Sequence, residues 1–319
     1  MNILKKSINN LIKKLHYKKL RKFKQIFNNI LGEVRIGFVD IGASIQIIQR
    51  WKKIDKSNLD YFLFEPNKSE IKKLKENKKF YNCYKIFDVA LSNKNHNKTL
   101  FITKGIYQTS FLKPNFSFLN KFKNVNRYKI VKKNNIKAKK LDDVKIENPD
   151  FIKIDVQGYN YEVVQGSNET LKNTIGIDIE VDFQQIYEKE IIYGKINDSL
   201  ISKGFEFIDF TYLSRWERDK FQNNGQCVFG NALYLKKPEF ILNKSSEIIK
   251  KYITISLLYN KFDLAKFVLK NTNKLKNKQE IFSEFHKLEK ISNKSNIIKS
   301  ISNGLVKFLD LDYNIHIFK

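Results

Sequence analysis

The sequence DFIKIDVQGYNYEVVQG, from Asp150 to Gly166, decides the fold of this chain. Its part from Phe151 to Val156 has the length and the apolar content of a buried strand, and Tyr159 to Gln165 continues as a helix. A glycine between the two permits a tight turn. A buried strand that leads into a helix is the repeating unit of an α/β protein with a parallel sheet. Asp155 then stands at the carboxyl end of the strand, where open α/β sheets bind ligands.

Two earlier stretches repeat this pattern, FVDIGAS at Phe38–Ser44 and FLFEPN at Phe62–Asn67. In the first, Ile36 to Ile41 reads as a strand with Asp40 at its tip. In the second, Glu65 follows the strand, and the proline after it stops the strand. An acid there, roughly 20 residues beyond a glycine turn, is placed to accept hydrogen bonds from both ribose hydroxyls of a nucleoside. The alternative is that the two acids only cap helices.

The turn after Asp40 bears on the identity of the ligand. A dinucleotide fold needs G-x-G-x-x-G to bring backbone amides onto a pyrophosphate, and a P-loop needs a terminal Gly-Lys-Ser/Thr. The sequence contains neither motif. With one glycine in the turn and an acid at both strand tips, a cationic ligand without phosphate fits better. We therefore predict S-adenosylmethionine as the cofactor.

Taken in order, the motifs of this chain resemble those of the FkbM-type methyltransferases, a branch of the class I S-adenosylmethionine-dependent enzymes. Each motif alone is weak, but the ordered series is specific. The motifs are FVDIGAS, FEPN, VALSN at Val89–Asn93, LDD at Leu141–Asp143, DFIKIDVQGYNYEVVQG, IGIDIEVDFQQIY at Ile175–Tyr187, KGFEFIDF at Lys203–Phe210 and GQCVFGNALYLK at Gly225–Lys236. The resemblance implies a Rossmann-like, mostly parallel sheet flanked by helices. It also implies an enzyme that methylates an oxygen, with a sugar hydroxyl of a surface glycan or its precursor as the expected acceptor.

The expected cofactor contacts come from the strand tips and the turns after them. They are Asp40, Gly42, Ala43, Ser44, Glu65, Pro66, Ala90, Asp155 and Gln157. One position departs from the family turn, Asp-x-Gly-Ala-x-x-Gly, because Gln46 replaces the last glycine. Its side chain must find room where the carboxylate end of the cofactor normally approaches the backbone. Two hypotheses therefore stand: an active methyltransferase, and a catalytically inactive binding or scaffold protein that keeps the fold.

Two carboxylates are the candidates for catalysis, Asp155 and Glu180. Methylation of a hydroxyl requires in-line attack on the methyl group and an acceptor for the proton. By comparison with class I enzymes, Asp155 lies near the methyl-bearing sulfur, and Glu180 belongs to the strand Ile175–Val181 at the same sheet edge. For Asp155, a purely structural or ligand-orienting role is the alternative. No spacing of ligands points to a metal, and we predict none.

About 60 residues separate the strand near Lys85–Leu91 from the strand of Asp155, too many for an ordinary crossover. We expect this insertion, residues 92–148, to form a lid over the substrate. Its stretch Tyr107–Phe122 mixes aromatic and hydroxyl residues. Thr109 and Ser110 match a hydroxyl-rich patch of the family branch that the chain most resembles. The alternative is a packed surface hairpin without ligand contact.

A second candidate for substrate contact is the stretch Thr211–Leu235. Arg215 and Trp216 combine a cation with a flat aromatic ring, which is how sugars and acidic substrates are often held. A role without substrate contact is the alternative for this pair. Val228–Leu235 alternates well enough to be the closing edge strand of the sheet.

Composition limits the other function classes. The two cysteines, Cys83 and Cys227, form no CxxC pair, which argues against a disulfide framework and a zinc knuckle. The formal charge of +27 comes almost entirely from lysine, as a strongly AT-biased genome would produce, so it is weak evidence for nucleic acid. Base-methylating enzymes of this class commonly carry Asn/Asp-Pro-Pro-aromatic after the central strand, where this chain has Asp155-Val156-Gln157-Gly158. We expect no nucleic-acid partner.

The two ends of the chain differ from its middle. Residues 1–30 contain nine Lys or Arg and no acid, and their apolar residues recur at helical spacing, which predicts a basic amphipathic helix over 1–33. Two roles are open for it: contact with an anionic membrane, or packing on the methyltransferase domain, residues 34–240. Residues 241–319 contain one glycine and no proline, which predicts a helical C-terminal appendage. We expect a cytoplasmic protein, with contact at the inner membrane face as the alternative; the sequence does not predict an oligomeric state.

Overall fold

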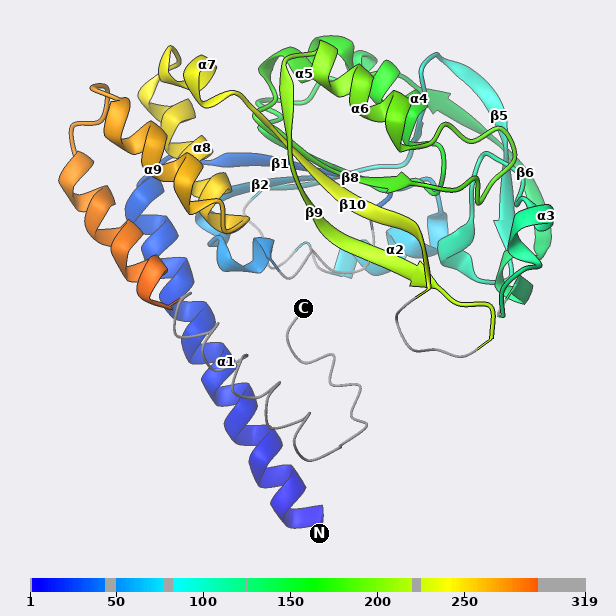
Figure 1. The fold of residues 1–319 in the computed structure, drawn as a ribbon, viewed down its shortest axis with the longest axis horizontal. Helices are drawn as coiled ribbons and strands as arrows, with labels where there is room; N and C mark the ends of the chain where they lie inside the picture. Colours follow the sequence, from blue (N-terminus) through cyan, green and yellow to red (C-terminus); the bar gives the residue numbers. More distant parts are fainter. Residues whose placement is uncertain are drawn as a thin grey trace.

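The computed structural model describes residues 2–43, 50–76, 78, 83–123, 125–219 and 225–291, with side chains from Tyr17 onward. A seven-stranded sheet forms its centre, in the order β3-β2-β1-β7-β8-β10-β9 (Figure 1). The strands are β1 (Ile36–Ile41), β2 (Leu59–Phe64), β3 (Cys83–Phe87), β7 (Phe151–Ile154), β8 (Gly176–Asp182), β9 (Phe205–Trp216) and β10 (Gln226–Lys236). Strand β10 runs antiparallel to β8 and β9, and the pairs among β3, β2, β1, β7 and β8 are parallel. This is the predicted Rossmann-like, mostly parallel sheet.

The prediction of an edge strand at Val228–Leu235 is wrong. These residues belong to β10, which pairs with β8 on one side and with β9 on the other. Strand β9 closes the sheet instead. The reason is that β9 and β10 form one long antiparallel hairpin whose second strand also pairs with β8, a pairing that no local pattern reveals.

One face of the sheet is covered by helices from both ends of the chain. Phe38 and Phe151 point to this face, and Trp51 stacks on Phe38 with 4.3 Å between ring centroids. Three helices pack on this face: α1 (Asn2–Leu31), α8 (Ser246–Leu258) and α9 (Phe262–Asn271). The short helix α7 (Pro238–Leu242) precedes α8 in the chain. The helices after β10 therefore bury the same core as α1.

The opposite face carries the alternate residues of the same strands. Val39, Ile152 and Ile179 pack there against α4 (Asn160–Gln165) and α6 (Tyr193–Ser202). Helix α5 (Asn168–Asn173) follows α4 in the chain, and α2 (Lys68–Glu76) connects β2 to β3. Because side chains alternate along a strand, strands buried on both faces appear in the sequence as continuous apolar runs.

A buried ion pair fixes α8 to the sheet. Lys251 Nζ lies 2.8 Å from Asp150 Oδ2, and the backbone N–H of Gly37 donates to the same oxygen at 2.8 Å. At the other end of the helix, Tyr259 donates a hydrogen bond to Asp178 Oδ2 at 2.9 Å. Breaking such a buried pair from one side typically costs about 3–5 kcal/mol, so these contacts specify how the helix sits on the sheet.

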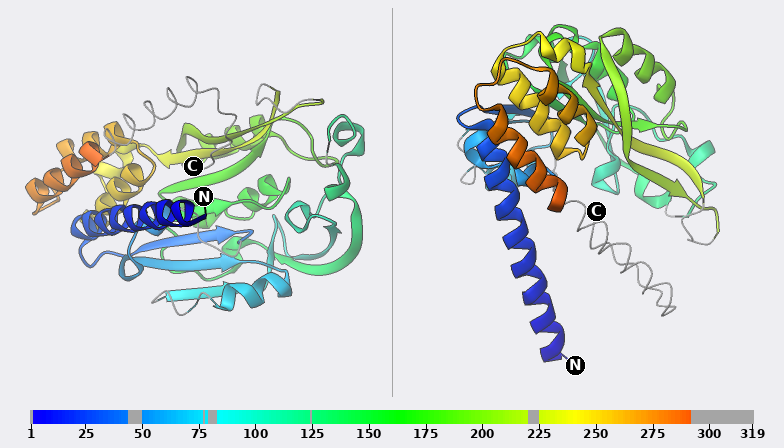
Figure 2. Two further views of the ribbon diagram at one scale, coloured as in Figure 1. Left: turned by 90° about the horizontal axis from the view of Figure 1, so that it is seen from below. Right: turned by 60° about the vertical axis from the view of Figure 1, so that its left-hand side comes forward.

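Helix α1 packs on the core through its C-terminal part alone, as far as its side chains are described. Phe23, Ile26, Phe27, Ile30 and Leu31 join the core, and the helix axis then continues outward as a single rod (Figures 1 and 2). No helix in the described part of the chain is long and apolar enough to cross a bilayer. The structure therefore bears out core packing for one part of the predicted helix.

The segment between β3 and β7 forms a second, smaller sheet beside the carboxyl ends of the parallel strands (Figure 1). Strand β6 (Ile130–Lys139) lies between β4 (Ala90–Leu91) and β5 (His96–Thr103), parallel to the first and antiparallel to the second. The short helix α3 (Phe116–Leu119) lies between β5 and β6 in the chain. The order in which the chain adds strands to the main sheet reverses between β1 and β7, which is the point at which open α/β sheets bind ligands.

Candidate functional site

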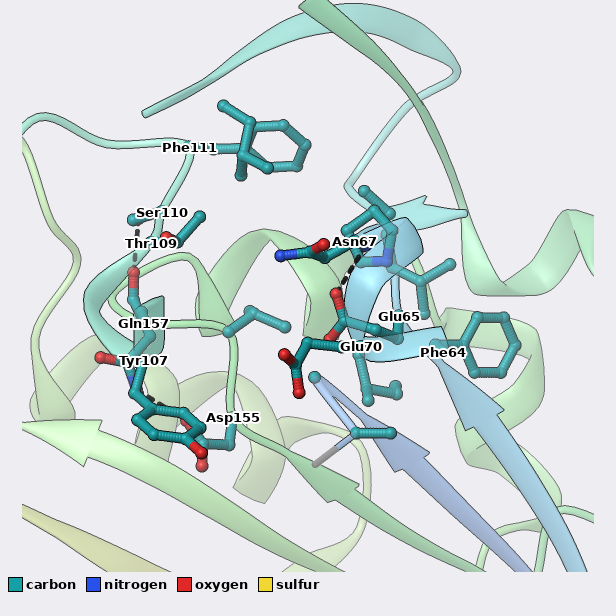
Figure 3. Close-up of a pocket in the computed structure, with 18 of the residues that line it drawn as sticks. Phe64, Glu65, Asn67, Glu70, Tyr107, Thr109, Ser110, Phe111, Asp155 and Gln157 are labelled. Carbon is teal, nitrogen blue, oxygen red and sulfur yellow. Dashed lines mark hydrogen bonds between the residues drawn. The ribbon is translucent and has the colours of Figure 1, made fainter. Parts of the chain in front are cut away.

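A cavity of about 210 Å³ opens at this point, at the carboxyl ends of β1, β2 and β7 (Figure 3). The second sheet and the loop after β5 form its other wall. The residues that line it include Gly42, Ala43, Glu65, Pro66, Asn67, Glu70, Ala90, Tyr107, Thr109, Ser110, Lys153, Asp155 and Gln157. Segments far apart in the sequence therefore meet around one space.

Most residues predicted for the site line this cavity. Among the predicted cofactor residues these are Gly42, Ala43, Glu65, Pro66, Ala90, Asp155 and Gln157, and the predicted substrate residues Thr109 and Ser110 lie beside them. Asp40, Glu180, Arg215 and Trp216 are not among the lining residues. Ser44 and Gln46 lie outside the described residues, so the effect of Gln46 on the turn stays a prediction.

The turn after β1 packs closely against the backbone at the ends of β2 and β7. Gly42 has a φ of +74°, a left-handed conformation that favours glycine, and a Cβ added to it would lie 1.9 Å from the carbonyl oxygen of Asp155. The N–H groups of Gly42 and Ala43 both donate to the carbonyl of Phe64 at 3.1 Å, and the N–H of Asp155 donates to Ile41 O at 3.0 Å. These bonds tie the ends of β1, β2 and β7 together under the cavity.

Glu65 stands at the end of β2 with its carboxyl group in the cavity wall (Figure 3). One oxygen accepts a hydrogen bond from the backbone N–H of Asn67 at 2.7 Å. Burial raises the pKa of Glu65 to about 7, and the nearby carboxylate of Glu70 acts in the same direction. The group is therefore a strong acceptor for ligand hydroxyls above that pH.

Asp40 lies beneath the cavity rather than in its wall. In the parallel register it is opposite Lys153, and its carboxyl is 3.2 Å from Lys153 Nζ. Tyr61 donates a hydrogen bond to its other oxygen at 2.8 Å, and the residue is only 1% exposed. Lys153 and Tyr61 thus hold Asp40 inside the protein, where it supports the site from below.

Lys153 is a central residue of the site that the sequence analysis missed. Its ammonium lies between two carboxylates, 3.2 Å from Asp40 and 3.5 Å from Asp155, and it donates to Gly42 O at 3.2 Å. Burial acts to lower the pKa of Lys153, but the two carboxylates outweigh it and the pKa is raised. The available signal was a single charge inside the apolar run Phe151–Ile154.

Gln157 connects the candidate catalytic carboxylates. Its side-chain amide donates to Asp155 Oδ1 at 2.9 Å and to Glu180 Oε1 at 3.1 Å. It accepts from the hydroxyl of Tyr187 at 3.2 Å, while its backbone carbonyl accepts from Ser110 Oγ at 2.6 Å. Its φ of +55° costs roughly 1–2 kcal/mol for a residue with a side chain, so these four bonds hold a strained conformation.

The two candidate catalytic acids have different environments. Asp155 lines the cavity, and about a third of its side chain is exposed, 31%. Glu180 lies behind it, where burial and then the charges of Asp155 and Asp182 raise its pKa well above the ordinary value. Of the two acids, Asp155 is therefore the one that a ligand in the cavity can reach. The described residues contain no cluster of His, Cys, Asp and Glu that could hold a metal ion.

The predicted substrate residues are engaged with the protein. Ser110 Oγ donates to Gln157 as described, and Thr109 Oγ1 accepts from the backbone N–H of Thr103 at 3.4 Å. Away from the cavity, Trp216 packs on Phe122 with 5.3 Å between ring centroids, inside an aromatic cluster. Near it, Arg215 donates to the backbone carbonyl of Gly225 at 3.4 Å. Substrate contact by these four residues stays a prediction.

A family model, the methyltransferase FkbM domain, matches residues 40–207. No relative is found among curated proteins. Similar solved structures include the FkbM methyltransferase of Methylobacillus flagellatus KT, with 14% identity, 64% of this chain and 45% of that chain covered, and a TM-score of 0.38. Two others are a precorrin-6y C5,15-methyltransferase of Geobacter metallireducens GS-15 (13% identity, 67% and 87% covered, TM-score 0.32) and the N-methyltransferase NodS of Bradyrhizobium japonicum WM9 (7%, 72% and 98%, TM-score 0.32).

The chain thus spans less than half the length of the Methylobacillus protein. At these TM-scores the structural likenesses are too weak to support a conclusion of their own. The family model is different, because it covers more than half of the chain and includes β2, β7 and the end of β1, which surround the cavity. The chain therefore belongs to the FkbM family of S-adenosylmethionine-dependent methyltransferases.

Proposed function

We propose that this methyltransferase acts on a hydroxyl oxygen, and that the acceptor is a sugar of a surface glycan or of its precursor. The observation that carries this proposal is the placement of Asp155, a partly exposed carboxylate in the wall of the cavity that also contains Glu65. A hydroxyl group needs a proton acceptor as its oxygen attacks, and a positioned carboxylate can provide one.

The cavity fits the cofactor of the family. Glycine at position 42 lets the turn after β1 pack against the backbone of Asp155 at the cavity, and the buried carboxyl of Glu65 is suited to a ribose diol. Glu65 would hold the ribose, the turn at Gly42 and Ala43 would approach the amino-acid end, and Val89 and Ala90 would contact the base. When bound, S-adenosylmethionine supplies an electrophilic methyl group on a sulfonium ion.

The protein's own part in the reaction is to position groups and to accept a proton. Asp155 accepts the proton of the acceptor hydroxyl, and Gln157 holds the carboxylate in place through its side-chain amide. Burial and the charge of Asp155 raise the pKa of Glu180 well above the ordinary value, which disfavours a second negative charge behind Asp155. Phe111 and Tyr107, from the loop after β5, cover the opposite wall and limit the access of water.

A neutral acceptor such as a sugar agrees with the charges of the lining. Among the described residues that line the cavity, Lys153 is the one cation, and Asp40 and Asp155 already neutralise it. A phosphate-bearing acceptor would gain little from such a wall, because anion binding needs free cations or amide groups. The sugar itself is a family-level expectation.

The test is a titration of the purified chain with S-adenosylmethionine and S-adenosylhomocysteine, followed by a methyl-transfer screen with glycans. Glu65→Ala should abolish saturable binding. Asp155→Asn should reduce turnover at least 100-fold, the range of general-base catalysis, while the affinity for S-adenosylhomocysteine changes by less than about threefold. Glu169→Gln, an exposed carboxylate far from the cavity, serves as the control.

Three results would contradict the proposal. No binding up to millimolar ligand would favour the inactive scaffold protein. Full turnover in Asp155→Asn would remove Asp155 as the base. A product methylated on nitrogen, identified by mass spectrometry, would show that the acceptor group is an amine and not a hydroxyl.

A further inference from the structure

Glu70 is a carboxylate in the cavity wall that takes no part in the proposed methyl transfer. It lies in the first turn of α2, is only 8% exposed, and lines the cavity with Glu65. Lys73 Nζ lies 2.7 Å from its Oε1. Its Oε2 is buried and has no hydrogen-bond partner among the described residues. A buried acceptor without a donor is costly, so the native state is expected to supply one.

The position of Glu70 on its helix does not account for this oxygen. An acid in the first turn of a helix interacts favourably with the helix dipole. The start of α2, however, is already capped by Asn67, whose side chain accepts from the N–H of Ser69 at 3.0 Å. A dipole interaction also requires no burial, and Lys73 uses only the other oxygen. The unpartnered oxygen therefore points to a ligand.

Glu65 and Glu70 together limit what that ligand can be. Figure 3 shows both side chains extending into the same space, and the charge of Glu70 contributes to the raised pKa of Glu65. Two carboxylates that line one wall repel each other unless donors lie between them. A vicinal diol offers two O–H donors on adjacent carbons, so it can supply one to each acid.

We propose that Glu70 is a second ligand-binding carboxylate, which accepts a hydrogen bond from one ribose hydroxyl of the adenosyl group while Glu65 accepts from the other. The proposal rests on the assignment of this cavity to the S-adenosylmethionine cofactor. It makes the pair Glu65–Glu70 a recognition element for an intact diol, which selects against deoxyribose and against ribose that carries a phosphate.

The experiment is calorimetry with S-adenosylhomocysteine and its 2′-deoxy and 3′-deoxy analogues. Glu70→Ala should lower the affinity for S-adenosylhomocysteine about tenfold, which is the effect expected for the loss of a hydrogen bond to a charged group. Glu70→Gln keeps an acceptor oxygen, so its affinity should lie between those of the wild type and Glu70→Ala. Glu76→Gln, an exposed acid on the same helix, is the matched control and should bind within twofold of the wild type.

The analogues separate a direct contact from an indirect effect. If Glu70 accepts from a hydroxyl, removal of that hydroxyl costs the wild type about tenfold and costs Glu70→Ala almost nothing, whereas the other analogue loses affinity in both proteins. Equal losses in both proteins for both analogues, or wild-type affinity in Glu70→Ala, would overturn the proposal. Melting curves by circular dichroism confirm that the variants are folded.

A separate result identifies a failure of the underlying function. If Glu65→Ala loses S-adenosylhomocysteine and Glu70→Ala does not, the cofactor site stands and only the role of Glu70 is wrong. If the wild-type protein itself binds no S-adenosylhomocysteine, both the cofactor assignment and the role of Glu70 are wrong.

Discussion

Lys153 is the residue through which the turn after β1 and the end of β7 are held together. Its ammonium reaches the backbone carbonyl of Gly42 and the carboxylates of Asp40 and Asp155. Asp40 has no route to solvent, because only 1% of the residue is exposed. Lys153 therefore supplies the counter-charge of a buried carboxylate beneath the cofactor turn.

Lys153→Met should destabilise the protein by about 3–5 kcal/mol, because it leaves the Asp40 carboxylate buried without a counter-charge. Urea unfolding followed by circular dichroism measures the loss. Lys140→Met removes a partly exposed pair with Asp143, 3.6 Å apart, and should cost less than about 1 kcal/mol. The double variant Asp40→Asn, Lys153→Met should recover part of the loss. Equal costs for the two lysine variants would show that the buried pair does not support the fold.

At the scale of elements, strand β8 brings acids together on one face. Asp178, Glu180 and Asp182 alternate with Ile177, Ile179 and Val181, so all three acids point to the face of the sheet that is opposite α4 and α6. Burial, and then the charge of Glu190, raises the pKa of Asp182 well above the ordinary value. At the end of this strand the protonated form of an acid is therefore more favoured than it is in an exposed acid.

Glu190→Gln should reduce the dependence of stability on pH. Burial raises the pKa of Glu190 from 4.5 to about 7, so its contribution to stability is fully present below 4.5 and is lost as the pH rises through 7. The glutamine does not titrate and keeps a carbonyl oxygen for the N–H of Tyr187, now bonded at 3.0 Å. The loss of stability between pH 5 and pH 8 should shrink by roughly 1–3 kcal/mol.

Thermal unfolding at pH 5, 6.5 and 8 measures this change. Glu188→Gln is the matched control, because Glu188 is exposed and lies two residues away. Its curve should follow that of the wild type at each pH. If the stability of Glu190→Gln depends on pH as that of the wild type does, the titration of Glu190 does not cause this dependence.

The sequence predicts the elements better than it predicts their neighbours. The apolar runs of β1, β2 and β7 show in the sequence because a strand buried on both faces must be apolar throughout. The place of β10 between β8 and β9 does not show in the sequence, because pairing between distant segments sets the strand order.

The same limit applies within the site. Glu65 could be predicted because it follows a strand directly. Lys153 acquires its role from Asp40, 113 positions earlier in the numbering, through the register of two parallel strands. Glu70 has no signal in the sequence beyond an acid near the start of a helix. Contacts between distant segments decide which side chains a cavity collects, and a local pattern does not contain them.

Helix α1 and the helices that follow β10 share one face of the sheet. The C-terminal part of α1 packs with α8, and the remainder of α1 extends past α8 and α9 (Figures 1 and 2). The first 22 residues contain eight Lys or Arg and no acid, whereas the described lining of the cavity contains a single cation. The basic segment at the start of the sequence thus differs in charge from the lining of the cavity.

We expect the projecting part of α1 to bind anionic membranes. Each lysine near an anionic surface contributes about 1 kcal/mol, so reversing two charges should weaken binding at least tenfold. The measurement is co-sedimentation with vesicles of phosphatidylglycerol and phosphatidylethanolamine, compared with phosphatidylcholine vesicles. Lys13→Glu, Lys14→Glu is the variant. Lys132→Glu, Lys133→Glu is the control, since these two residues are exposed on β6 and give the same change in net charge.

The wild type should sediment with the anionic vesicles at low salt and be released as the salt concentration rises, because screening weakens surface attraction. The control pair should bind nearly as well as the wild type, since β6 belongs to a different part of the fold. If both pairs weaken binding equally, net charge alone attracts the protein and α1 has no special role. If the wild type stays in solution with anionic vesicles, the basic helix serves the protein in another way, and its packing on the core is its structural role.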